Sequence, residues 1–204
     1  MSTLNSNFPQ KFPLKVVLAS GSPRRRELLL ELVPEFEVVV SDVDEEALTT
    51  DDPWETAENL SLAKATAVSK LRPDTLVIGG DTVVAIDNEQ LAKPENEEHA
   101  RVVLRRLSGA THMVITGITL IHQGQSETFS VTSHVSFREL SDEEIREYIA
   151  TGEPMDKAGA YAIQGGASAF VSKLEGSLSN VIGLPLEALR DRLGKFRPQE
   201  LGEI

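Results

Sequence analysis

The chain passes directly from a short apolar run into a turn of small residues and then into a helix. The run "LKVVLA" (residues 14–19) has the length and uniform apolarity of a buried strand. Ser22 and Pro23 form a favoured pair of N-cap and first helical residue, and a stripe of leucines predicts a helix over 23–32. A strand joined so closely to a helix predicts an α/β fold.

Apolar runs and helical patterns continue to alternate along the chain. A period of two in the apolar residues of 129–137 is typical of a half-exposed antiparallel strand, so the sheet should be mixed. The other expected strands are 36–40, the two apolar runs on either side of Gly79-Gly80-Asp81-Thr82, 112–121, 161–166 and 168–174. The other expected helices are 53–71, 96–107, one between a capping box at Ser141 and a stop at Gly152, and 183–193.

Composition limits the possible partners and compartment. The net charge of −12 argues against a broad nucleic-acid surface, and the lack of cysteine excludes disulfides and thiolate metal sites. No apolar run approaches the roughly 20 residues that span a bilayer, and the N-terminus lacks a secretory signal. We therefore expect a protein of a reducing compartment with no nucleic-acid or membrane partner. Residues 1–13 read as a polar tail, and 14–204 as one domain or two closely joined lobes.

Three consecutive arginines stand where the first helix begins, although the positive end of a helix disfavours cations. A strand, a tight turn and a helix N-terminus together form an anion site. Ser20 and Ser22 add hydroxyl donors there, and Arg24 and Arg25 add guanidinium groups suited to phosphate. On the pattern alone, a capped surface helix with solvated arginines remains an equal alternative.

Carboxylates follow two of the expected strands. Asp81 comes after an apolar run and two glycines, and at a strand end it could ligate a metal or accept a proton from water. A turn aspartate within a hairpin is the alternative. The acidic loop "SDVDEE" (41–46) could supply a second metal ligand, although a solvated loop explains most of its charges.

Three further side chains suit a nucleotide. Lys64 falls on the apolar face of its expected helix, so its amine either reaches out to solvent or meets an anion. Lys93 precedes a proline that holds it in an extended segment, from which it could reach a phosphate. Gln164 lies in a segment rich in glycine and alanine, and its amide can both donate to and accept from a base edge.

Seven segments in order resemble the Maf family of nucleotide pyrophosphatases: "LASGSPRRRELL", "LAKA", "VIGGDTVV", "LAKP", "LSGATHMVITG", "GEPMDKAGAYAIQG" and "GSLSNVIGLPLEAL". The resemblance covers about residues 14–193. It implies a two-lobed Maf/ITPase-like α/β fold with a mixed twisted sheet, helices around it and a deep central cleft. It also implies a cytoplasmic enzyme that cleaves nucleoside triphosphates to monophosphate and diphosphate with a divalent cation, Mg²⁺ or Mn²⁺. A homodimer is consistent with it.

The resemblance carries roles over to particular residues. Gly80 departs from it, because the family usually has alanine there. The segments "SGSPRR" and "AYAIQG" resemble the branch that acts on dTTP and UTP, not the branch that acts on 7-methyl-GTP. The implied roles are proton acceptor for Asp81, phosphate binding for Ser22, Arg24, Arg25, Lys64 and Lys93, substrate choice for Arg24, Thr82 and Gln164, and metal binding for Asp81 with Glu45.

The expected activity is therefore hydrolysis of dTTP and UTP, which serves to clean the nucleotide pool. Uracil and thymine present the same N3–H and O4 groups, so a site reading that edge accepts both. Two alternatives remain at this point. One is a broader pyrophosphatase that clears modified nucleotides, and the other is a nucleotide sensor that regulates cell division without turnover.

Overall fold

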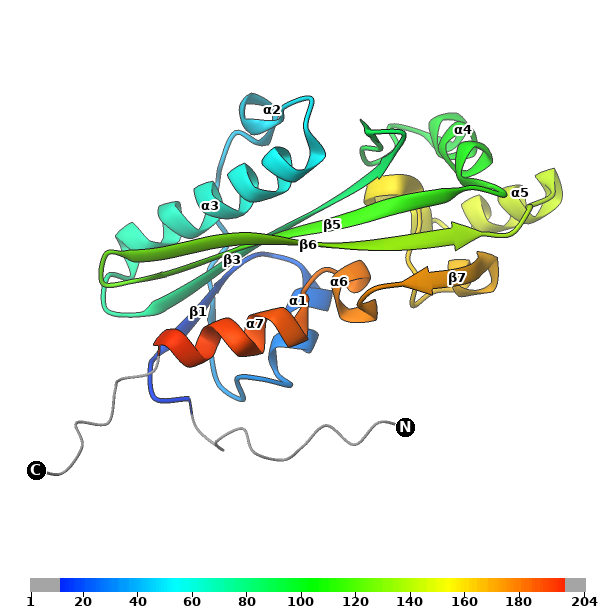
Figure 1. The fold of residues 1–204 in the computed structure, drawn as a ribbon. Helices are drawn as coiled ribbons and strands as arrows, with labels where there is room; N and C mark the ends of the chain where they lie inside the picture. Colours follow the sequence, from blue (N-terminus) through cyan, green and yellow to red (C-terminus); the bar gives the residue numbers. More distant parts are fainter. Residues whose placement is uncertain (1–11, 197–204) are drawn as a thin grey trace, which may run out of the picture.

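A computed structural model describes residues 12–196 and contains one seven-stranded mixed sheet with helices on both faces (Figure 1). The strand order is β2-β1-β3-β5-β6-β7, and β4 pairs with β3 beside this path. The expected mixed α/β class is confirmed. The expected N-terminal tail lies outside the described residues except at its end, where Phe12 is buried in the core.

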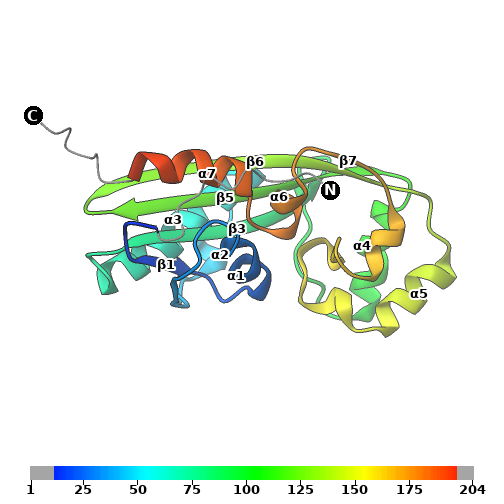
Figure 2. The same ribbon diagram turned by 90° about the horizontal axis from the view of Figure 1, so that it is seen from below.

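The first half of the chain forms the parallel part of the sheet. Strand β1 pairs in parallel with both β2 and β3, and Figures 1 and 2 show α1 and α3 on opposite faces. The point where successive crossovers change face is a topological switch, beside which α/β proteins bind ligands. The elements are β1 (Val16–Ala19), α1 (Pro23–Leu29), β2 (Glu37–Val38), α2 (Glu45–Leu48), α3 (Pro53–Leu71) and β3 (Leu76–Ile86).

The second half supplies long antiparallel strands and a group of helices at one end of the sheet (Figure 2). These elements are β4 (Glu89–Gln90), α4 (Glu97–Leu107), β5 (Thr111–His122), β6 (Gln125–Phe137), α5 (Asp142–Ala150), η1 (Glu153–Asp156), η2 (Ala158–Ala160), η3 (Gly166–Phe170) and β7 (Val171–Glu175). The chain then returns along the α1 face as α6 (Leu178–Ile182), α7 (Leu186–Leu193) and η4 (Gly194–Phe196).

Local capping signals place several helices as expected. Ser22 caps α1 by accepting the backbone N–H of Arg25, and the capping box of Ser141 and Glu144 starts α5. Gly152, with φ of 75°, follows the end of α5. The first helix is shorter than expected and ends at Leu29 instead of residue 32, and the second strand is only two residues long.

Two glycines of the sheet let α3 pack unusually close to it. A Cβ atom at Gly79 would overlap the carbonyl oxygen of Ser61, and one at Gly117 would overlap that of Ala57. Both carbonyls belong to α3, so its backbone lies directly on the sheet. This close packing determines how far Lys64 stands from the strands. It also explains why β3 runs unbroken through Gly79 and Gly80, where the sequence indicated two separate apolar runs.

The segment 161–166, expected as a strand, is not one, and the strand expected over 168–174 begins only at Val171. Gly159 and Ala160 adopt positive φ just before this segment, and the glycines at its end face the side chain of Glu153. These features bend the chain away from the sheet.

Buried apolar residues form two main clusters. One joins α1, α7 and the β1 end of the sheet, and the other joins α4, α5 and the η helices at the far end. No helix of the described residues is long and apolar enough to cross a membrane.

Candidate active site

The candidate site lies where β1 stops beside β3. Strand β1 ends at Ala19, opposite Gly79, and β4 pairs with β3 only from Ala85 onward. Residues 80–84 of β3 therefore have no strand on that side within the part of the chain that the structure describes. Because successive side chains of a strand point to opposite faces, Asp81 faces α3 and Thr82 faces α1. Both helices thus reach the same open edge of the sheet.

On the α3 face, Lys64 joins two carboxylates. Its Nζ lies 2.6 Å from Oδ1 of Asp81 and 2.7 Å from Oε1 of Glu45. The side chains of Lys64 and Asp81 are only 13% and 14% exposed, whereas that of Glu45 is 58% exposed. The hydrogen bond from Lys64 lowers the pKa of Glu45, and the charges of Lys93 and Arg25 act in the same direction. Of the two alternatives for Lys64, the amine meets an anion, supplied by the chain itself.

On the α1 face, Arg25 links three parts of the fold. Its guanidinium donates to the carbonyl oxygen of Gly183 at 2.9 Å, to Oγ of Ser20 at 3.2 Å and to Oγ1 of Thr82 at 2.8 Å. Burial lowers the pKa of Arg25, and the charge of Asp81 opposes that effect. These contacts give Arg25 a role in stabilising the fold, in addition to the phosphate binding expected from the sequence.

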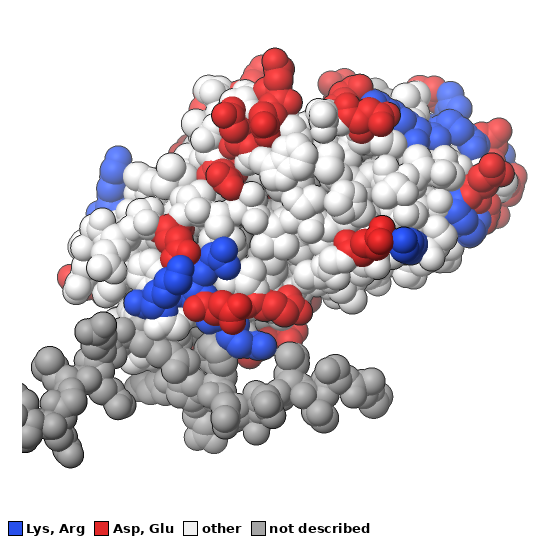
Figure 3. Space-filling view, in the orientation of Figure 1, with Lys and Arg blue, Asp and Glu red and all other residues white. Residues whose placement is uncertain are grey.

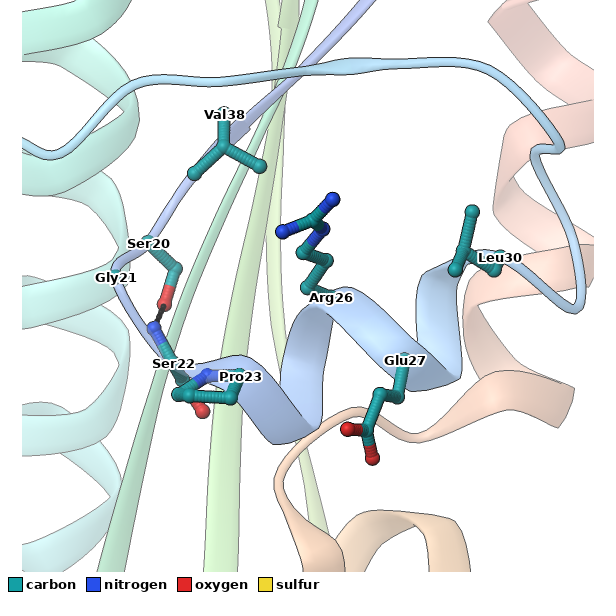
Figure 4. A pocket seen from close by; sticks show the side chains of 8 residues that line it. All are labelled: Ser20, Gly21, Ser22, Pro23, Arg26, Glu27, Leu30 and Val38. Carbon is teal, nitrogen blue, oxygen red and sulfur yellow. Dashed lines mark hydrogen bonds between the residues drawn. The ribbon is translucent and has the colours of Figure 1, made fainter.

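The β1–α1 turn opens onto a cavity of about 370 Å³ (Figure 4). Ser20 and Ser22 line it at the turn, and Figure 4 shows the side chain of Arg26 extending between Leu30 and Val38. Arg26 matched no function in the sequence, yet it is the arginine of the run that lines this cavity. Successive residues of a helix point in different directions, so Arg26 lines this cavity whereas Arg25 points to β3.

The other expected site residues are dispersed around this edge. Lys93 is exposed and lies close enough to Glu45 to lower the pKa of that carboxyl. Arg24 makes no hydrogen bond or ion pair with the described residues, but its charge helps to lower the pKa of Asp156 on η1. Gln164 follows η2, has an exposed side chain, and contacts none of the clustered site residues through a hydrogen bond.

Asp81 lies within a strand and not at its end, which corrects the position expected from the sequence. The hairpin-turn alternative is also wrong, because β3 is continuous from Leu76 to Ile86. Asp81 still borders the space beyond the last residue of β1, since Gly79 is the last residue of β3 that β1 pairs. The sequence predicted that Asp81 would be open to a ligand because it ends a strand. It is open because the neighbouring strand β1 is shorter than β3.

Within residues 12–196 no three carboxylate or histidine side chains converge in a way that could hold a metal. Asp81 and Glu45, which share the amine of Lys64, are the two carboxylates that come together at the site. A divalent cation between a protein and a phosphate uses one or two carboxylates and completes its shell with phosphate and water. The pair therefore fits a cation that binds together with a phosphate ligand.

Several residues at the site carried no recognisable sequence signal. Thr116 shares a hydrogen bond with Thr82 and donates to the backbone carbonyl of Asn180, whose side chain is fully buried. Gly183 supplies the carbonyl that receives Arg25. These contacts join residues far apart in sequence, so only the strand register and the return of the chain along the α1 face bring them together.

The arrangement of strands and helices matches solved structures of a known class. The Ham1 protein of Staphylococcus aureus aligns with a TM-score of 0.51 and 14% identity, covering 89% of this chain and 98% of that one. The HAM1 protein of Coxiella burnetii aligns with a TM-score of 0.51 and 16% identity, covering 89% of this chain and 99% of that one. The protein therefore has a Ham1-like α/β fold.

Sequence comparison identifies the family within that fold. The Maf-like protein family model matches residues 15–196. A protein of Bacillus cereus (strain B4264) named dTTP/UTP pyrophosphatase is 45% identical over 183 residues, which cover 89% of this chain and 95% of its own. A Symbiobacterium thermophilum protein of the same name is 45% identical over 182 residues, covering 89% and 94%. The chain belongs to the Maf-like family.

Proposed function

We propose that the protein is a nucleoside triphosphate pyrophosphatase that hydrolyses dTTP and UTP to the monophosphate and diphosphate. The observation that carries this proposal is the cluster of Lys64, Asp81 and Glu45 at the open edge of β3, beside the serine-rich turn of α1. The names of relatives that are 45% identical over most of the chain support the same substrates.

Asp81 is the residue that we assign to the reacting water. Its carboxylate is largely shielded and has a hydrogen bond from Lys64 on one oxygen, Oδ1. The second oxygen can accept a proton from a water directed at the phosphorus. Arg24, Lys64 and Lys93 are the cations that we assign to the triphosphate, because groups arranged in advance around a developing charge stabilise it strongly. The N–H groups of Arg25 beyond its three protein contacts can do the same.

We assign divalent metal binding, by Mg²⁺ or Mn²⁺, to Asp81 and Glu45. When bound, such a cation would offset negative charge on the phosphate and lower the pKa of a nearby water. Lys64 holds these two carboxylates together, since its Nζ contacts both. With substrate bound, the ammonium of Lys64 can pair with a phosphate instead of the two carboxylates.

The remaining assignments rest on the sequence. We propose Thr82 and Gln164, with Arg24, as residues of substrate choice, and the two main apolar clusters as the cores of two lobes around a cleft. On the face drawn in Figure 3, acidic side chains gather over α2 and the start of α3, and the basic ones form no broad continuous patch. This charge pattern supports a small-molecule substrate without a nucleic-acid partner. The proposed compartment is the cytoplasm, and the proposed assembly a homodimer.

The test is release of diphosphate from dTTP, UTP, CTP, GTP and 7-methyl-GTP with Mg²⁺ or Mn²⁺. We expect release from dTTP and UTP, loss of turnover in Asp81→Asn, and unchanged turnover in Asp87→Asn, which makes the same change in the exposed turn after β3. Tight nucleotide binding without diphosphate release from any nucleotide would favour the sensor instead. Equal release from dTTP and GTP would overturn the pyrimidine assignment.

A further inference from the structure

The segment that carries Gln164 is held at both ends by two side chains of the neighbouring helices. We define this segment, residues 161–166, as the Gln164 loop. The backbone N–H of Ala162 donates to the hydroxyl of Tyr148 at 3.1 Å, and that of Gly166 donates to Oε2 of Glu153 at 3.2 Å. The hydroxyl of Tyr148 in turn donates to Oε1 of Glu153 at 2.8 Å. Tyr148 and Glu153 thus form one clamp on the loop.

The loop between these anchors is a tight turn. The N–H of Gly165 donates to the carbonyl of Ala162 at 3.0 Å, which closes a four-residue turn with Gln164 at its third position. A Cβ atom on Gly165 would overlap the carboxylate of Glu153, and one on Gly166 would lie 3.2 Å from the ring of Tyr148. The glycines therefore let the clamp approach the loop backbone, and the clamp determines where the Gln164 side chain starts.

The phenol of Tyr148 keeps its proton in the range where enzymes work. Tyr148 is 4% exposed, and burial together with Glu153 raises the pKa of its phenol. The phenol accordingly stays protonated and remains a donor to the Glu153 carboxylate. The ring of Tyr148 packs edge to face on Phe170 with centroids 5.2 Å apart, so loss of the hydroxyl alone leaves the packing of the ring intact.

The short stretch before the loop lies within electrostatic range of the arginine-bearing turn. The hydrogen bond from Lys157 is the main cause that lowers the pKa of Asp156, on η1 between Glu153 and the loop, and the charge of Arg24 acts in the same direction. Lys157, the next residue, donates to the backbone carbonyl of Glu153 at 3.3 Å, so the same short stretch is tied to the clamp. The stretch that leads from the clamp into the Gln164 loop therefore lies within electrostatic range of the start of α1.

We propose that Tyr148 and Glu153 are positioning residues that orient Gln164 toward the pyrimidine edge and so determine the preference for UTP over CTP. The inference rests on the proposed function, in which Gln164 reads the base. Uracil presents an N3–H donor and an O4 acceptor, and cytosine presents the reverse pattern. An amide held in one orientation discriminates between them, whereas a mobile amide can rotate to suit either.

The experiment measures the ratio of kcat/KM for UTP to kcat/KM for CTP in Tyr148→Phe, Gln164→Ala and the double variant. We expect Tyr148→Phe to lower this ratio about three- to tenfold, mainly by raising KM for UTP, which is the range of one neutral hydrogen bond. The double variant should show no further loss beyond Gln164→Ala, because the clamp acts through Gln164. Glu153→Gln should reproduce the effect of Tyr148→Phe.

The control is Ser172→Ala, which removes an exposed hydroxyl on β7 that donates to the backbone carbonyl of Ser136 at 3.1 Å, away from the loop and its clamp. We expect it to leave the ratio unchanged. An unchanged ratio in Tyr148→Phe and Glu153→Gln, or additive losses in the double variant, would overturn the positioning role while the proposed function stands. If the wild type releases no diphosphate, the proposed function fails. In that case the ratio of Kd for UMP to Kd for CMP in the same variants tests the positioning role of the clamp. An unchanged Kd ratio in Tyr148→Phe would overturn that role.

Discussion

Arg24 and Arg25 are neighbours in the sequence that the structure places in different surroundings. Arg25 donates three hydrogen bonds that link the β1–α1 turn, β3 and the turn before α7. Arg24 makes none with the described residues. We therefore predict that Arg25→Met destabilises the fold, whereas Arg24→Met leaves its stability unchanged and weakens substrate binding.

The expected magnitude follows from the contacts of Arg25. A hydrogen bond from a charged group contributes about 1.5–3 kcal/mol, and burying the guanidinium offsets part of that gain. The hydroxyls of Ser20 and Thr82 each keep a second partner when the arginine is removed, which limits the penalty. We estimate a net loss of about 3 kcal/mol. A chain of this size changes its Tm by about 2–4 °C per kcal/mol, so Arg25→Met should unfold roughly 10 °C lower.

Thermal unfolding followed by circular dichroism, with urea unfolding as a second measure, gives the stability of both variants. Steady-state kinetics with UTP give KM, which we expect to rise in Arg24→Met because a phosphate contact is lost. A Tm of Arg25→Met within about 2 °C of the wild type would refute the reasoning. So would an equal decrease in both variants, because the two arginines would then have equivalent roles.

Two further predictions concern the sheet. Gly117→Ala should lower the free energy of unfolding by about 1–3 kcal/mol and lower turnover, because its Cβ overlaps the carbonyl of Ala57 and moves α3 off the sheet. The control is Gly194→Ala, because Gly194 has open space around it, and urea unfolding measures the stability of both variants. Burial lowers the pKa of His112 to about 4 from 6.5, so as pH falls the unfolded chain takes up this proton before the folded one. Stability should therefore decrease by about 2 kcal/mol between about pH 7.5 and about pH 5. His112→Gln should remove that part of the pH dependence of stability, as measured by urea unfolding at several pH values. The same pH dependence in the variant and the wild type would contradict this prediction.

Elements with local start signals were predictable from the sequence. The helix expected over 53–71 has those bounds in the structure, and Asp52 caps it by accepting the N–H groups of Trp54 and Glu55. The same holds for the capping box at Ser141. Such signals act between residues three or four apart, so no tertiary contact is needed to recognise them.

Elements decided by distant contacts were not predictable. The glycines at 79 and 80 suggested a break, but the strand continues because α3 lies against Gly79 and leaves no room for a side chain. The run 161–166 is apolar enough for a strand, but its backbone N–H groups donate hydrogen bonds to Tyr148 and Glu153, which hold it as a loop. In both places a partner far along the chain outweighs the local preference.

The site itself illustrates the same division. Residue types alone indicated Asp81, Lys64 and an acidic loop, from which the family resemblance singled out Glu45. They left open whether the lysine meets an anion and whether the aspartate lies in a turn. The answer depends on register: β1 stops opposite Gly79, while β3 continues to Ile86. This difference in strand length opens one edge of β3 to helices from both faces. Lys64 reaches Asp81 from one face, and Arg25 reaches Thr82 from the other. A longer β1 would cover this edge and close the site, whatever residues the strand carried.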